Sequence, residues 1–431
     1  MASVHSIPSI DEQFVFTSGA KKKISILAAI GVVLVLVGVY FLANAGGHDA
    51  AHAAHGEAHD AGHAYSWTKR LWANLWLNGM FFTGISVIGM FWLSYNYLAQ
   101  AGWSVVFKRI PEAMPAFLPI TGGIMLLTFL VGGHDLFHWT HESLYDVNSP
   151  DYDPIIAGKQ GYLNTPFFLI RFVLYFVLWY GLWRVLRQAS LLEDQLGGLD
   201  HYEKSVKFGT IFLVVFGVTS STSAWDFVMS IDTHWFSTMF GWYTLANWHV
   251  TGLATMVLII LALKEAGYLK AVNASHLHDL GKFVFAFSIF WTYVWFAQFL
   301  LYYYANIPEE VIYFKERLVG YGEVYRVTFF VNIIMNFVLP FLLLMTRDSK
   351  RTYVTLRLAC WAVIIGHYID FYNNIMPGTV GAHGGIGALE IGLVLVFAAA
   401  FIWVVLSQLE KANLIPKNHP MLQESLHHDI E

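Results

Sequence analysis

The chain has 431 residues, of which 56% are hydrophobic and 13% are charged, and its formal net charge is −5. Soluble domains usually carry about 25% charged residues, so this composition excludes an ordinary soluble protein, and no basic patch indicates nucleic-acid binding. The single cysteine, Cys360, excludes an internal disulfide and an iron–sulfur cluster held by this chain alone.

Ten apolar runs, each long enough to cross a bilayer as a helix, follow one another along the sequence. We expect helices over residues 24–43, 71–98, 117–133, 166–183, 208–229, 239–263, 283–304, 327–346, 354–372 and 384–406. The first run follows Lys21, Lys22 and Lys23 and is expected to remain as an anchor. The predicted fold class is therefore an all-α polytopic membrane protein with ten transmembrane helices.

The lysines and arginines are unevenly divided between the two ends of the predicted helices. The more basic end includes Lys108, Arg184 and Lys264, whereas the other end includes Lys159 and Lys315. The positive-inside rule assigns the more basic end to the cytoplasm. Both termini are then expected in the cytoplasm, as an even number of helices requires.

The second half of the chain repeats features of the first in the same order. The matches are Ala73-Asn74 with Ala246-Asn247, Phe167-Phe168 with Phe329-Phe330, and Asp226-Phe227 with Asp370-Phe371. They predict two parallel four-helix bundles, made of helices 2–5 and 6–9 and flanked by helices 1 and 10.

This repeat divides the chain into seven expected regions. They are a cytoplasmic segment (1–23), flanking helix 1 (24–43), a histidine-rich periplasmic loop (44–70), the first bundle (71–230), the second bundle (231–376), flanking helix 10 (377–408) and a cytoplasmic tail (409–431).

The densest group of ionisable residues follows the third helix at its outer end. It contains His134, Asp135, His138, His141 and Glu142. His134 and His138 share a helical face if the helix continues, and histidine beside carboxylate can exchange protons near neutral pH. The group is a candidate proton acceptor for a quinol, and a solvated helix end is the alternative.

Two aspartates, Asp226 and Asp370, occupy matching places near the outer ends of helices 5 and 9. An ionisable residue inside a membrane helix is a candidate functional residue, so both are placed on a possible proton pathway. The alternative is a structural ion pair with Arg171 or Arg326. Arg171, one turn inside helix 4, could instead face a quinone headgroup.

Three further residues inside the spans are proton-pathway candidates. Glu390 is expected a turn or two inside helix 10, among glycines that permit close helix contact. His249 is expected in the middle of helix 6, and His367 shares a face with Asp370. The two histidines could also be imagined as ligands of one haem, although hydrogen-bonded histidines are commoner in helix bundles.

A histidine-rich stretch lies in the first outer loop. Its histidines are spaced as on one helical face, and such tracts can bind metal; they are His48, His52, His55, His59 and His63. A flexible or partner-contacting loop is the expected alternative, and no resident metal is predicted.

The whole pattern resembles a known family, the NrfD/PsrC-type membrane subunits, and within it the second such subunit of bacterial alternative complex III. The likeness extends over nearly the whole chain. The residues that carry it are Gly132-Gly133-His134-Asp135-Leu136-Phe137-His138-Trp139, Ser223-Ala224-Trp225-Asp226-Phe227-Val228-Met229-Ser230 and His367-Tyr368-Ile369-Asp370.

The resemblance implies a subunit of a quinol-oxidising respiratory complex in the bacterial inner membrane. It implies a related ActC-like paralogue, an iron–sulfur subunit and c-type cytochrome subunits as partners, and electrons passing to a cytochrome c or a terminal oxidase. Haem c and iron–sulfur clusters would lie on those partners, and menaquinone or ubiquinone would be the substrate. In that family the paralogue has the clearer claim to the quinol site. A proton-coupled transporter or ion channel is the alternative function.

Overall fold

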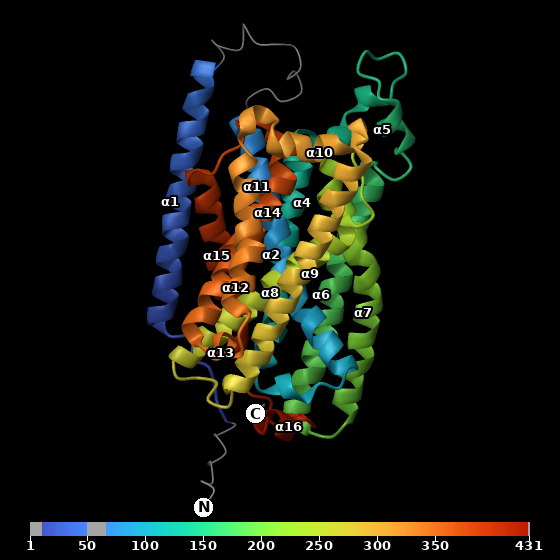
Figure 1. Cartoon of the computed structure of the whole chain (residues 1–431). Helices are drawn as coiled ribbons and strands as arrows, with labels where there is room; N and C mark the ends of the chain where they lie inside the picture. Colours follow the sequence, from blue (N-terminus) through green and yellow to red (C-terminus); the bar gives the residue numbers. More distant parts are fainter. Residues whose placement is uncertain (1–10, 50–65, 430–431) are drawn as a thin grey trace, which may run out of the picture.

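The computed structural model describes residues 11–49 and 66–429. In this part of the chain the regular structure is helical, and a single β-bridge joins Gln13 to Asn413. Ten helical segments are long and apolar enough to cross a membrane, and they stand side by side in one upright bundle (Figure 1). The predicted class, an all-α polytopic membrane protein, is therefore confirmed.

Besides short 3₁₀ turns, the described chain contains ten spans and four short α-helices. The spans are α1 (Ser18–Asp49), α2 (Trp67–Leu98), α3, η3 and α4 (together Arg109–Leu136), α6 (Thr165–Leu196), α7 (Asp200–Phe227), α8 (Phe240–Glu265), α9 (Ala274–Ala305), α11, η8 and α12 (together Arg326–Leu344), α14 (Tyr353–Val380) and α15 (Ala388–Leu409). The short helices are α5 (Pro154–Gly158), α10 (Pro308–Leu318), α13 (Arg347–Arg351) and α16 (Leu422–Leu426).

Most spans are longer than the apolar runs from which they were predicted. The helix predicted to end at residue 183 continues to Leu196, and the one predicted to begin at 283 starts at Ala274. A helix can continue beyond the hydrocarbon core of the bilayer, because its backbone hydrogen bonds persist there while its charged side chains reach water. The start of α9 is fixed by Asn273, whose side chain accepts the Ser275 and His276 N–H groups.

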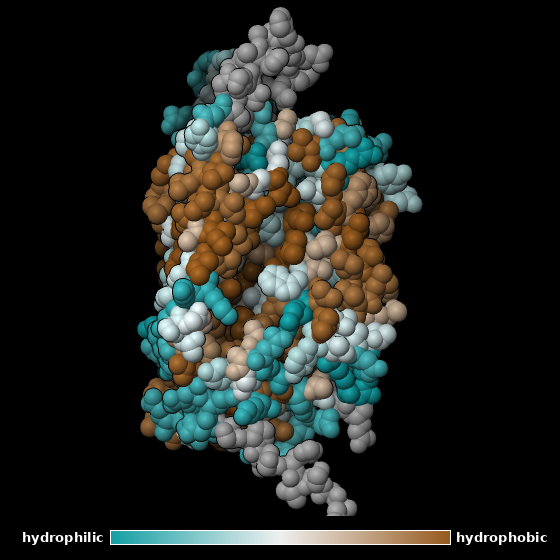
Figure 2. Space-filling view, turned by 90° about the vertical axis from the view of Figure 1, so that its left-hand side faces the viewer, coloured by the Kyte–Doolittle hydropathy of each residue, from teal (hydrophilic) through white to brown (hydrophobic). Residues whose placement is uncertain are grey.

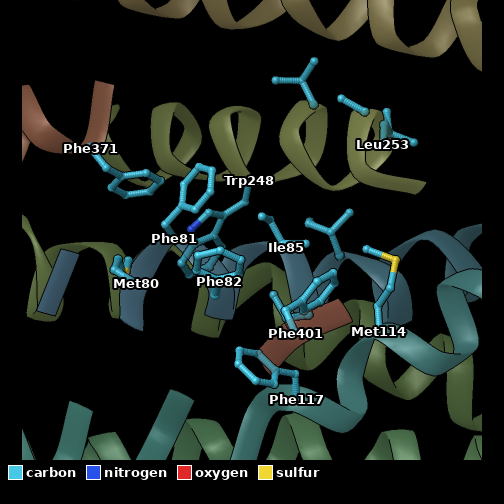
Figure 3. Close-up of a cluster of buried hydrophobic side chains, with 14 of the residues drawn as sticks. Met80, Phe81, Phe82, Ile85, Met114, Phe117, Trp248, Leu253, Phe371 and Phe401 are labelled. Atoms are coloured by element: carbon cyan, nitrogen blue, oxygen red, sulfur yellow. The ribbon is translucent and has the colours of Figure 1, made fainter. Parts of the chain in front are cut away.

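The most buried span, α2, joins the two halves of the molecule. It packs against α4 and α7 of the first half and against α8 and α14 of the second, while α6 packs on α7 and α9 packs on α8. Gly84 permits this approach, since a Cβ there would lie 1.9 Å from the Trp248 indole. Figure 3 shows Phe81 beside Phe371 and Trp248, and Phe82 near Phe117 and Phe401.

The two flanking helices, α1 and α15, form a pair on one side of the bundle (Figure 1). Their contact depends on glycine. A Cβ at Gly38 would lie 2.5 Å from the Leu389 nitrogen, and one at Gly392 would lie 2.7 Å from the Val35 nitrogen. Small residues let membrane helices approach in this way, which is the close contact predicted around helix 10.

The surface is banded, as expected of a protein that spans a bilayer. Figure 2 shows hydrophobic residues over the middle of the molecule and hydrophilic residues at both ends. One end carries both ends of the described chain, where Asp11 pairs with Lys417 at 3.0 Å; we call it the terminal end. The opposite end carries α5 and α10 (Figure 1) and is called the loop end.

A proline inside α14 explains a wrong helix boundary. The helix was predicted to end at residue 372, yet it runs through Pro377 to Val380. Proline lacks the N–H that would bond to the carbonyl four residues earlier, and Arg317 Nε of α10 donates to that carbonyl, on Asn373, at 2.8 Å. Asp370 therefore lies about three turns inside the helix rather than near its end.

Candidate functional site

A cavity of about 350 Å³ lies at the loop end, between the two halves of the molecule. We call it the loop-end vestibule. Its walls come from the start of α2, the end of α4 with the turn after it, the segment between α7 and α8, and α10 with the turn after it. The ionisable or phenolic residues among the lining residues are Lys69, His134, Asp135, His138, His141, Asp232, His234, Tyr313, Glu316 and Tyr321. The long segments at the loop end thus gather many ionisable groups around one space.

The predicted histidine group lies on this wall, but in a different conformation. The α4 helix ends at Leu136, and extended Phe137 separates it from a short 3₁₀ turn that begins at His138. His134 and His138 therefore do not share a helical face. The loop instead folds back, so that His141 Nε2 lies 3.0 Å from the His134 carbonyl oxygen.

On the opposite wall, Tyr313 of α10 is held by a buried arginine. The Arg317 guanidinium lies over the Tyr313 ring at 3.3 Å and donates to Asp232 Oδ2 at 2.9 Å. Trp235 stacks on the other side of the ring, with the centroids 3.9 Å apart. Burial raises the pKa of Tyr313 above its usual value, so its phenol keeps its proton and donates.

Hydrogen bonds lead from this tyrosine into the membrane. The Tyr313 hydroxyl donates to Asn374 Oδ1 at 2.9 Å, and Asn374 Nδ2 donates to the Tyr243 hydroxyl at 3.2 Å. The Tyr243 hydroxyl then donates to Asp370. These four side chains, each less than a tenth exposed, connect the vestibule with a carboxyl group three turns inside α14.

Asp370 receives only neutral donors. Besides Tyr243, Asn247 Nδ2 and Asn332 Nδ2 donate to it at 2.7 and 2.9 Å. Arg326, a predicted alternative partner, pairs with Glu323 instead. Since a buried carboxyl without a compensating cation is costly to ionise, Asp370 is chemically suited to hold a proton.

Further buried polar groups lie in the second half of the molecule, between Asp370 and the terminal end. His367 is buried against Trp291, and neither of its ring nitrogens has a hydrogen-bond partner among the described residues. The same holds for Ser288 Oγ and Asn336 Oδ1. Asn336 lies in the π-helical turn Ile334–Val338, just before Pro340. Buried polar atoms are usually satisfied by protein or water, so this region is suited to hold internal water.

The corresponding aspartate of the first half is held in an ion pair. Arg171 Nε and Nη2 donate to the two oxygens of Asp226, both at 2.8 Å, and the Tyr175 hydroxyl donates at 2.7 Å. Asp226 is fully buried. This is the structural pairing that the sequence left open, and it places Arg171 away from the vestibule wall.

The difference between the two halves comes from one position in the repeat. The two halves match with a shift of one residue from the predicted alignment: Phe168 and Phe329 are the buried phenylalanines, and the third residue after each faces the aspartate of its own half. In the first half this residue is Arg171; in the second it is Asn332. The repeat therefore has one carboxyl neutralised by a cation and one that is not.

Glu390 is held at the beginning of a helix, not inside one. It is the third residue of α15, and Gly387 N–H donates to it at 2.8 Å. Arg70 Nε and Asn74 Nδ2 donate to its other oxygen at 2.8 and 2.9 Å. The predicted helix began too early because the preceding glycines are not helical. Arg70 was not identified as a site residue from the sequence.

His249 is separate from this polar route. Its ring lies between Phe287 and Tyr95, with centroid distances of 4.1 and 5.8 Å. His249 and His367 thus occupy different aromatic clusters. In the described part of the chain no group of three or more His, Cys, Asp or Glu is placed to hold a metal ion.

The histidine-rich stretch mostly lies outside the described residues. His48 falls in the last turn of α1; His52, His55, His59 and His63 belong to the segment between the two described ranges. The interpretation of this stretch as a flexible or partner-contacting loop, with metal binding as the alternative, stays a prediction.

Two groups of ionisable residues were missed in the sequence. Glu316 of α10 lines the vestibule, and burial together with nearby Asp232 raises its pKa to about 7. At the terminal end, Glu112 accepts from Arg109 and Arg187, both at 2.5 Å. Apolar periodicity could not reveal either group, because both depend on contacts between distant segments.

Comparison with protein-family models finds no match to this chain, and comparison with curated proteins finds none either. The functional argument therefore depends on the geometry of the site.

Proposed function

We propose that this chain is a membrane subunit of a quinol-oxidising respiratory complex and that its own residues handle protons. The observation that carries the proposal is the line of hydrogen bonds from Tyr313 to Asp370. Glu316 of the vestibule, whose pKa is raised to about 7 by burial and by nearby Asp232, takes up and releases protons near neutral pH, and Asp370 stores one inside the bilayer.

Each group has a distinct task in this scheme. His134, Asp135 and His138 exchange protons with a quinol bound nearby or with water. Tyr313 and Tyr243 order the connection to Asp370, while Asn374 holds the two phenols in line and water carries the proton past its amide. Electron transfer is left to partner subunits that carry haem c and iron–sulfur clusters.

The second half of the repeat is the conducting half in this proposal. Asp370 can load and unload a proton because its donors are neutral, whereas Asp226 is neutralised by Arg171. Arg171, Asp226 and Glu390 are assigned to holding helices together. His367 and the orphaned polar atoms beyond Asp370 extend the route toward the terminal end.

The subunit is proposed to lie in a bacterial inner membrane with both termini in the cytoplasm. The basic residues of the terminal end support this orientation. An ActC-like paralogue, an iron–sulfur subunit, c-type cytochromes and, downstream, a terminal oxidase are the proposed partners. They would co-purify with the chain from native membranes.

The test uses the complex reconstituted in vesicles with quinol as substrate. Tyr243→Phe and Asp370→Asn should reduce proton movement per electron at least severalfold while the complex still assembles. Tyr175→Phe is the matched control, because it removes the equivalent phenol from the ion-paired aspartate of the first half. The proposed route is contradicted if Tyr243→Phe and Asp370→Asn move as many protons per electron as the control variant Tyr175→Phe.

A proton-coupled transporter is the second candidate function. The π-helical turn before Pro340 favours it, because interrupted helices beside a buried carboxyl are typical of transporters. The two functions differ in isolation from native membranes: a transporter would purify without subunits that absorb as haem, whereas the proposed subunit would bring them with it.

A further inference from the structure

A short basic helix, α13, joins two spans at the terminal end (Figure 1). It follows the span that ends at Leu344 and precedes α14, which begins at Tyr353. It packs against α9. Because the spans on both sides of it are apolar, α13 lies at the border between the hydrocarbon core of the bilayer and its headgroups.

A glycine of α9 determines where Lys350 of α13 lies. A Cβ at Gly281 would lie 2.9 Å from the Lys350 Cβ, so a larger residue there would displace the lysine. The Lys350 ammonium lies over the Phe285 ring, 4.9 Å from its centroid, and donates to the Met345 and Thr346 carbonyls at 3.4 and 3.2 Å. Lys350 is only 7% exposed, and these acceptors are neutral.

The charged residues around Lys350 are mostly positive. Burial and the nearby Lys282 ammonium lower the pKa of Lys350. Lys282 pairs with Asp279 at 2.6 Å, but the same carboxylate also accepts from His428 at 2.8 Å. Together, residues 279–282 and 347–351 contain four lysines and arginines and two aspartates, so this group, which we call the α9–α13 basic group, has an excess of two positive charges.

The lipid-facing surface of the protein begins beside this group. Leu342, near the end of α12, is 61% exposed, and Val354, at the start of α14, is 65% exposed. In a membrane, such side chains contact acyl chains. A water-soluble anion would contact the cations alone, whereas a phospholipid would contact the cations with its phosphate and the apolar residues with its tails.

We infer that the α9–α13 basic group binds the headgroup of one anionic phospholipid in the leaflet at the terminal end. The exposed Lys282 ammonium donates to the phosphate, and Lys350 contributes a fixed positive charge beneath it. The acyl chains lie against Leu342 and Val354. Basic pockets between membrane helices bind anionic headgroups in this way.

The inference goes beyond the proposed function and requires only that the chain spans a membrane. The α9–α13 basic group shares no residue with the vestibule or with the hydrogen-bonded route to Asp370. Each idea can therefore fail without the other.

The test is native mass spectrometry of the full-length protein in a neutral detergent, which counts bound lipids one by one. The protein is titrated with phosphatidylglycerol and, separately, with phosphatidylcholine of the same acyl chains. The first phosphatidylglycerol should bind at least fivefold more tightly, because choline cancels the charge of the phosphate. Lys282→Gln and Lys350→Met should each weaken its binding about fivefold, whereas inorganic phosphate at the same concentration as the lipid should not displace it.

Two further variants distinguish a site from general attraction to the leaflet. Lys22→Gln/Lys23→Gln removes two exposed lysines of α1 and should change the binding of the first phosphatidylglycerol less than twofold. Gly281→Ala keeps every charge but displaces Lys350, and it should weaken binding severalfold. The inference is overturned if the α1 variant loses as much affinity as Lys282→Gln, if the two lipids bind equally, or if inorganic phosphate displaces phosphatidylglycerol.

Discussion

Removing either partner of the Arg171–Asp226 ion pair should strongly destabilise the first bundle. Both partners are less than a tenth exposed, and their two hydrogen bonds are 2.8 Å long. Removing one member of a buried pair leaves the other charge uncompensated, which typically costs about 3–5 kcal/mol. We therefore expect Arg171→Met to destabilise the protein by this amount, and Asp226→Asn by a similar one.

The double variant Arg171→Met/Asp226→Asn should cost less than the sum of the two single changes. No charge is then left uncompensated. The double variant should therefore cost about 2–3 kcal/mol less than the summed costs of the two single variants. The assay is reversible unfolding in bicelles or mixed detergent micelles, which gives a free energy of unfolding for each variant. The reasoning is refuted if Arg171→Met costs less than about 1 kcal/mol or if the two changes are additive.

Three further predictions test other parts of the structure. Asn332→Arg should give the second bundle the same ion pair as the first, so that proton movement is lost while assembly is kept; undiminished proton movement would contradict it. Glu316 should make the protein less stable as pH rises from about 4.5 to about 7, since the folded form binds its proton more tightly than the unfolded form. In thermal melts across this range, Glu316→Gln should remove this fall of the melting temperature with pH, and an unchanged fall would count against the assignment. Gly84→Ala should destabilise the packing of α2 on Trp248 by about 1–3 kcal/mol in unfolding titrations, whereas Gly123→Ala, which meets no neighbour, should change little.

The existence and order of the ten spans could be predicted from hydropathy, whereas their ends could not, because caps such as Asn273 and polar contacts outside the hydrocarbon decide them. Asp226 and Asp370 could also be recognised as a matched pair. The different environments of the two aspartates could not be predicted, because the deciding residues, Arg171 and Asn332, lie on other helices. Only packing places each beside its aspartate. The predicted alignment of Phe167-Phe168 with Phe329-Phe330 is shifted by one residue, and it put Arg171 opposite Ile333 instead of Asn332.

The vestibule was the least predictable part of the site. His134, His138 and His141 were recognised, whereas His234 was not. The helical face that His134 and His138 would share if the helix continued is absent, because the backbone turns at Phe137. Tyr313 and Glu316 were missed because they lie on α10, a short amphipathic helix outside the spans. Its position over the other wall is a property of the folded loop, which periodicity does not encode.

The bond from Arg317 to the carbonyl left free by Pro377 has a mechanical consequence. It makes an extramembrane helix part of the backbone bonding of a membrane span. If α10 tilted, the guanidinium would leave that oxygen without a donor, and the same tilt would pull Tyr313 away from Asn374. Two side chains of α10, Arg317 and Tyr313, therefore couple the position of this helix to α14 and, through Asn374 and Tyr243, to Asp370.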